Sequence, residues 1–152
     1  MKLAEALILR SDLQKRLAQL KQRMLLNARV QEGDEPSEDP ALLVAAFEED
    51  AAELERLIRQ INRTNLATEI EPGVTVTDAL ARRDALRLRA GAYRELAQSA
   101  SISQTRHLRS EIKFVSAVDV RAVQQRADAL AQELRELDAR VQSANWTYDL
   151  ME

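Results

Sequence analysis

Two stretches of the chain carry apolar residues at alternating steps of four and three. The later run consists of Val123, Ala127, Leu130, Leu134, Leu137, Val141 and Ala144. The earlier run consists of Leu43, Phe47, Asp50, Leu54, Leu57, Ile61 and Thr64. This spacing places one apolar seam along a long helix. The pattern therefore predicts helices packed on helices. The two polar members, Asp50 and Thr64, occupy positions where a polar residue that fixes the register of the helices is tolerated.

The first half of the chain predicts two long helices joined by an acidic connector. A first helix over about residues 3–30 carries its apolar stripe at Leu13, Leu17, Leu20 and Met24, with Leu9, Leu25 and Leu26 beside it. Apolar residues on more than one face predict two packing partners. Residues 32–39 break the period and are acidic, which indicates a connector. Asp39 followed by Pro40 is the favoured order of an N-cap and a first helical residue, so the second helix is predicted to begin there.

The middle of the chain predicts a small hairpin. After Ile61 the sequence turns polar over 62–65, and extended segments are expected over about 66–76, interrupted by Pro72-Gly73. Proline and glycine in this order suit a type II turn. Thr77 is predicted to cap a third helix that ends near Ala100.

The second half of the chain predicts an extended segment and a last helix. Residues 109–118 contain β-branched and aromatic side chains and are expected to form another short strand beside the hairpin. Asp119 is predicted to cap the fourth helix, which is expected to end near Asn145.

Four rods of similar length with short links predict an antiparallel four-helix bundle, mainly α, with a small β-hairpin appendage. We expect residues 1–152 to form a single domain around one core. Apolar residues make up 45% of the chain and charged residues 31%, with only three glycines and three prolines, which is typical of a helical globular protein.

Composition also excludes several classes of protein. The chain has no cysteine, so it has neither disulfides nor thiolate metal ligands. Residues 1–10 include Glu5 and lack the small-residue pattern of a cleavage site, and no apolar run approaches eighteen residues. We therefore expect a cytoplasmic protein that neither carries a signal peptide nor spans a membrane.

Charge is distributed unevenly along the first third of the chain. Residues 1–31 hold seven basic and two acidic residues, whereas residues 32–55 hold ten acidic residues and no lysine or arginine. In antiparallel helices, the basic residues Lys15, Arg16, Lys21, Arg23 and Arg29 would lie beside Glu48, Glu49, Asp50, Glu53 and Glu55. Either the two segments attract each other specifically, or they are two solvated faces of opposite sign.

Few residues suggest catalytic or metal chemistry. His107 and Glu111 are four positions apart, a spacing that on a helix permits a shared metal ion. The chain has only this one histidine and lacks the paired motifs of carboxylate metal bundles. No catalytic triad or nucleotide-binding loop is present, so no catalytic residue, metal site or cofactor is assigned.

A polar group follows the predicted end of the second helix. Asn62, Arg63, Thr64 and Asn65 provide donors there, and Arg82 and Arg83 lie early in the third helix. Together they suit either an anion site or a polar network beneath the hairpin, with structural capping the preferred interpretation.

Arginine outnumbers lysine eighteen to four, which raises the possibility of nucleic-acid or other polyanion binding through the first helix and the cluster at 106–113. Basic residues elsewhere alternate with acidic ones, and few aromatic residues are present for base stacking. Two aromatic residues near the end, Trp146 and Tyr148, are candidates for locking the bundle or contacting another subunit.

Three segments, 64–86, 109–120 and 144–146, resemble a family of small bacterial helical proteins of unknown function, some of which carry the label septicolysin. The most distinctive parts are Thr-Asp-Ala-Leu at 77–80 and Arg-Ser-Glu-Ile-Lys at 109–113. The resemblance implies a bundle that forms a homo-oligomer, for which it suggests a hexamer, and it supplies no catalytic residues.

The leading hypothesis from the sequence is a non-enzymatic, self-assembling helical bundle. The alternatives are a module that binds nucleic acid or another polyanion, and a metal-dependent hydrolase using His107 and Glu111.

Overall fold

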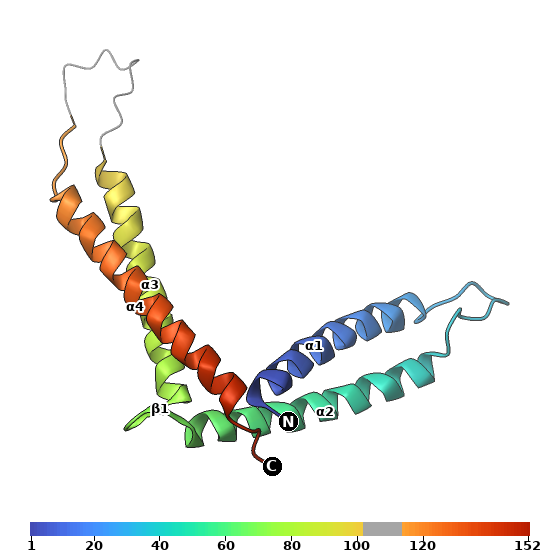
Figure 1. The fold of residues 1–152 in the computed structure, drawn as a ribbon. Helices are drawn as coiled ribbons and strands as arrows, with labels where there is room; N and C mark the ends of the chain where they lie inside the picture. Colours follow the sequence, from blue (N-terminus) through green and yellow to red (C-terminus); the bar gives the residue numbers. More distant parts are fainter. Residues whose placement is uncertain (102–113) are drawn as a thin grey trace. The chain divides into compact units, whose positions relative to one another are not determined.

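Helices dominate the computed structural model, which describes residues 1–101 and 114–152 (Figure 1). In chain order the elements are α1 (Leu3–Leu26), α2 (Pro40–Ala67), β1 (Glu69–Glu71), β2 (Val74–Thr75), α3 (Val76–Ala100) and α4 (Val120–Thr147). The two strands pair into one small sheet. The prediction of a mainly α fold with four helices and a small β-hairpin is therefore confirmed for the part of the chain that the structure describes.

The described residues divide into two compact units. The first comprises residues 1–69 and 142–152, and the second comprises residues 70–141. Each unit has its own buried apolar cluster, whereas the sequence led us to expect one core. A single bundle domain over residues 1–152 stays a prediction.

Within the first unit, α1 and α2 lie side by side and antiparallel (Figure 1). Their buried cluster is formed by Leu3, Ala6, Leu13, Leu57 and Ile61. Leu13, Leu57 and Ile61 belong to the predicted stripes, whereas Leu3 and Ala6 extend the α1 stripe toward the start of the helix.

The side chains of Asn27 and Asp39 cap the two helix ends that flank the connector, the end of α1 and the start of α2. The Asp39 carboxylate accepts a hydrogen bond from the Ala41 amide at 2.9 Å, which confirms Asp39 as the N-cap of α2. Helix α1 ends at Leu26, four residues earlier than predicted. The Asn27 side chain donates to the Arg23 carbonyl at 2.9 Å and accepts from the Glu38 amide at 3.0 Å, so it closes the helix and anchors the connector.

Helix α2 extends to Ala67, beyond the predicted end at Ile61. The polar run 62–65 therefore lies inside the helix, which corrects the prediction of a helix end there. The Thr64 hydroxyl donates to the Gln60 carbonyl at 2.8 Å and accepts from the Met151 amide at 2.9 Å. Because this buried hydroxyl is fully satisfied, it does not interrupt the helix.

The hairpin turn has the predicted chemistry. Gly73 has a φ of 78°, the value that the third position of a type II turn requires.

Helix α3 begins at Val76 with Thr75 as its N-cap, so the prediction of Thr77 as the cap was wrong. Thr75 and Asp78 form a reciprocal capping box: the Asp78 amide donates to the Thr75 hydroxyl at 3.1 Å, and the Asp78 carboxylate accepts from the Thr75 amide at 3.1 Å.

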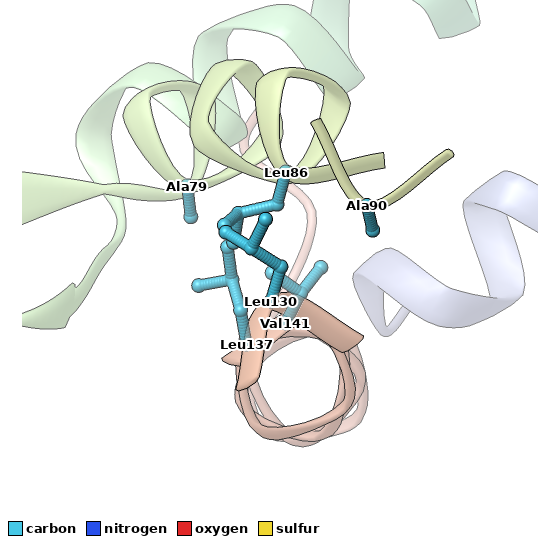
Figure 2. Close-up of a cluster of buried hydrophobic side chains, with 6 residues drawn as sticks. All are labelled: Ala79, Leu86, Ala90, Leu130, Leu137 and Val141. Atoms are coloured by element: carbon cyan, nitrogen blue, oxygen red, sulfur yellow. The ribbon is translucent and has the colours of Figure 1, made fainter. Parts of the chain in front are cut away.

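Figure 2 shows the buried cluster of the second unit, where side chains of α3 and α4 face one another. Its members are Ala79, Leu86, Ala90, Leu130, Leu137 and Val141. The α4 residues belong to the predicted seam, and the Asp119 carboxylate accepts from the Ala122 amide at 3.1 Å, as expected of an N-cap. Helix α4 ends at Thr147, two residues beyond the predicted end.

The expected strand over 109–118 is absent from its described part, residues 114–118. Phe114 and Val115 are 80% and 81% exposed. A β-branched or aromatic side chain favours a strand only where a neighbouring strand packs against it, and here no ladder forms. Residues 109–113 lie outside the described part of the chain.

Replacing Leu137 with alanine tests the second core. Leu137 is 1% exposed, and truncating a buried leucine costs about 2–5 kcal/mol of unfolding free energy. We expect chemical denaturation of this variant to begin at a clearly lower denaturant concentration. Leu88→Ala, at a position that is 75% exposed, is the control and should change little; equal effects of the two changes would contradict the assignment of this core.

Candidate functional site

A carboxylate lies inside the seam of the first hairpin. Asp50 is 2% exposed, and both of its oxygens accept hydrogen bonds from the Arg16 guanidinium, through Nε and Nη2. This two-point contact neutralises the buried charge and fits only one orientation of the arginine. The prediction that Asp50 is a polar member of the seam is confirmed, and the pairing gives α1 and α2 a defined register.

A hollow of about 520 Å³ lies beside this ion pair, between α1 and α2. It is lined by Leu9, Leu13, Arg16, Glu49, Asp50, Ala52, Glu53 and Arg56. Arg56 pairs with Glu53 at 2.5 Å, so most of the charge around the hollow is neutralised within the hairpin.

A second ion pair joins the end of α1 to the connector. The Arg23 guanidinium donates to Glu38, with Nε at 3.0 Å from the carboxylate. This hydrogen bond, more than the charge attraction itself, lowers the pKa of Glu38 below its ordinary value and raises that of Arg23. The predicted attraction between the basic and acidic segments is thus realised by Arg16 with Asp50 and by Arg23 with Glu38.

The two ends of the chain meet in the first unit. The Leu3 amide donates to the Tyr148 carbonyl at 3.0 Å, and the Leu150 amide donates to the Met1 carbonyl at 2.8 Å. The Lys2 ammonium lies 3.0 Å from the Asp149 carboxylate. These contacts hold the C-terminal tail against the start of α1.

The predicted anion or polar-network residues fall in both units. Asn62, Arg63 and Asn65 lie in the last two turns of α2, where Arg63 donates to the Glu152 carbonyl at 3.3 Å. Arg82 and Arg83 lie in the second unit, and Arg83 is 3.9 Å from Asp138. Arg63 therefore acts as a tether of the C-terminal tail, and a joint anion site of all five residues stays a prediction.

The candidate metal pair, His107 and Glu111, lies outside the described residues, as does most of the basic cluster at 106–113. Within residues 1–101 and 114–152, no group of three or more potential metal ligands gathers.

Three of the five basic residues of α1 form ion pairs with carboxylates of the same chain: Lys15, Arg16 and Arg23. Lys2, just before the helix, also forms one. Because charges already paired release fewer counterions on binding a polyanion, the structure offers less support to nucleic-acid binding by α1 than the sequence did.

Exposed apolar side chains are the feature that sequence reasoning underestimated. In the described residues, sixteen large apolar side chains are exposed, whereas only eleven of the buried apolar residues are larger than alanine. Both candidate contact aromatics belong to the exposed set, with Trp146 57% and Tyr148 41% exposed. The seam pattern identified which residues are buried, but helices that pack in pairs leave their other apolar faces uncovered.

No helix among the described residues contains an apolar stretch long enough to cross a bilayer.

The geometry defines a mainly α protein built from long paired helices with a small sheet. Residues 10–150 match the model of a family of unknown function, DUF6847, and the chain belongs to this family. A solved structure with the same fold is the crystal structure of a functionally unknown conserved protein from Corynebacterium diphtheriae. It is 43% identical to this chain, with a TM-score of 0.93 over 99% of each chain. No curated protein matches the chain, and neither match carries the septicolysin label expected from the resemblance.

Removing Arg16 tests the buried ion pair. Arg16→Met leaves the Asp50 carboxylate buried without a partner, which we expect to cost about 3 kcal/mol of unfolding free energy. Replacing both partners, in Arg16→Met with Asp50→Leu, should recover most of that loss because no charge remains in the seam. Equilibrium denaturation of the two variants gives the comparison, and a double variant no more stable than Arg16→Met would refute this account.

The Arg23–Glu38 contact predicts a dependence on pH. Because the pKa of Glu38 is depressed in the folded protein, the contact stabilises the hairpin above the unfolded-state pKa and is lost as pH falls through the folded-state pKa. An NMR titration of the Glu38 carboxyl should give a lower midpoint in the wild type than in Arg23→Gln. Identical midpoints would argue against the contact in solution.

Proposed function

We propose that this protein is a non-enzymatic, self-assembling helical protein whose exposed apolar side chains bind other copies of the same chain. The observation that carries this proposal is the excess of large apolar side chains on the surface over those in the two cores. Burial of such side chains is favourable by about 25 cal/mol per Å² of apolar surface, so association offers a stabilisation that the separate chain lacks.

The composition of the cores supports the same proposal. Six of the seventeen buried apolar residues are alanines, which provide little apolar area each. Paired helices bury one stripe apiece, and helical hairpins of this kind commonly gain further stability by packing against additional helices. A second copy provides such helices with matching length.

The polar centres favour assembly over catalysis. The buried carboxylate Asp50 is neutralised by Arg16, and Glu53 at the same hollow is paired with Arg56. A general acid or base needs a carboxyl that exchanges its proton near the working pH, and carboxylates held by arginine are poorly suited to that role.

Three finer expectations from the sequence stay predictions under this proposal. They are a hexameric assembly, a cytoplasmic location, and a contribution of Trp146 and Tyr148 to a subunit contact. The exposure of both aromatic side chains is consistent with that contribution.

Sedimentation equilibrium of the full chain over micromolar concentrations tests the proposal. We expect a mass that exceeds the 17.2 kDa of one chain and rises with concentration until a single oligomer is reached. A mass of one chain throughout this range would reject self-assembly.

A further inference from the structure

The far end of the first hairpin carries exposed apolar side chains on both helices. Leu25, in the last turn of α1, is 62% exposed, and Val44, in the second turn of α2, is 44% exposed. The hydrogen bond from the Glu38 amide to Asn27 ties the connector to the end of α1 beside them. This end of the hairpin therefore presents an apolar surface that the first unit leaves open.

These two side chains lie on the flank of the hairpin that faces away from the hollow. The hollow is lined by Arg16 on α1 and Glu53 on α2. At 3.6 residues per turn, Lys21 lies about 140° around α1 from Arg16, and Val44 lies about 180° around α2 from Glu53. Leu25 follows Lys21 by one turn, and Glu48 follows Val44 by one turn, so all four residues share the flank opposite the hollow.

Two charged residues on this flank, Lys21 and Glu48, form no ion pair within the described part of the chain. Arg16 and Arg23 pair with carboxylates on the other flank and at the connector, but no ion pair involves Lys21 or Glu48. Both side chains are exposed. The surface thus has one unpaired positive charge on α1, one unpaired negative charge on α2, and apolar side chains one turn away from each.

We propose that this surface, formed by Lys21, Leu25, Val44 and Glu48, is where two copies of the chain meet about a two-fold axis. In such a contact the same patch occurs on both sides. If one residue of the first copy contacts a second residue of the other copy, the second residue of the first copy makes the same contact in return. Lys21 of each copy then faces Glu48 of the other, and Leu25 packs against Val44 of the other copy beside each ion pair, one turn nearer the connector. Because the surface carries one positive and one negative side chain, Lys21 and Glu48, it is complementary in charge to itself, which favours a second copy of the chain as its partner. This inference rests on the proposed function.

Charge reversal with mixing tests the contact directly. Lys21→Glu places glutamate opposite glutamate twice in its own dimer, and Glu48→Lys places lysine opposite lysine twice. We expect each variant alone, at low ionic strength, to dimerise at least about tenfold more weakly than the wild type. An equimolar mixture restores two opposite-charge pairs, so it should associate about as tightly as the wild type and form only mixed dimers.

Mixing separates an effect between copies from an effect within one chain. Each variant keeps its altered charge in the mixture, so a defect within its own chain would persist, and recovery on mixing shows that the charges act between copies.

Arg89→Glu is the control for Lys21→Glu because it makes the same change of net charge at an exposed arginine of α3 that has no ion pair in the described residues. It should leave association unchanged. Leu25→Ser should weaken dimerisation, whereas Leu88→Ser, at a 75% exposed leucine of α3, should not. Circular dichroism of each variant confirms that the helices are retained.

The outcomes distinguish the two proposals. If the wild type assembles while both charge reversals assemble equally well, self-assembly stands and this surface is wrong. If the reversals weaken association but their mixture does not restore it, the pairing of Lys21 with Glu48 is wrong. If the wild type is a monomer throughout, both proposals fall.

Discussion

The pairing of a buried carboxylate with one arginine is the interaction on which the first hairpin depends. Asp50 occupies a seam position that an apolar residue would otherwise fill, and among the described residues only Arg16 neutralises it. A sliding of α1 by one turn would leave this charge buried and unpaired, which is far more costly than an imperfect apolar contact. The ion pair therefore adds little to stability by itself but strongly disfavours other registers. The apolar seam, in contrast, is similar at each heptad and discriminates weakly between them.

Two small cores explain why so much apolar surface is left over. Each pair of helices buries a single seam, and several of the buried positions are alanines, which contribute little apolar area. The remaining leucines and valines on the outer faces have nothing to cover them within their own unit. Because these apolar side chains stay exposed when long helices pack only in pairs, association with further helices is favourable.

Much of the helical architecture was predictable because its signals are local. Seam spacing identified α2 and α4, and Asp39-Pro40 and Asp119 marked the starts of those helices through their own hydrogen bonds. The predicted end of α2 was wrong where a partner distant in the sequence contributes. Thr64 lies within α2, and the amide of Met151, far along the chain, donates to its hydroxyl.

The candidate site was less predictable than the helices for the same reason. Charge counting indicated that the first two segments attract each other, but several carboxylates near Arg16 were equally available in the sequence. Only the three-dimensional register selects Asp50, and it leaves Lys21 and Glu48 without an ion pair among residues 1–101 and 114–152. The N-cap of α3 could have been predicted from the sequence. A threonine with an acidic residue three positions later, as in Thr75 and Asp78, is a stronger signal of a helix start than Thr77, which has no such residue.

The meeting of the two chain ends has a consequence for biosynthesis. The first unit is built from residues 1–69 together with 142–152, so the whole second unit is made between its two segments. The hairpin of α1 and α2 emerges from the ribosome long before the segment that Lys2 and Thr64 hold. Until residues 142–152 follow, the nascent hairpin has an uncovered edge, so the first unit is completed only after the second unit has been made.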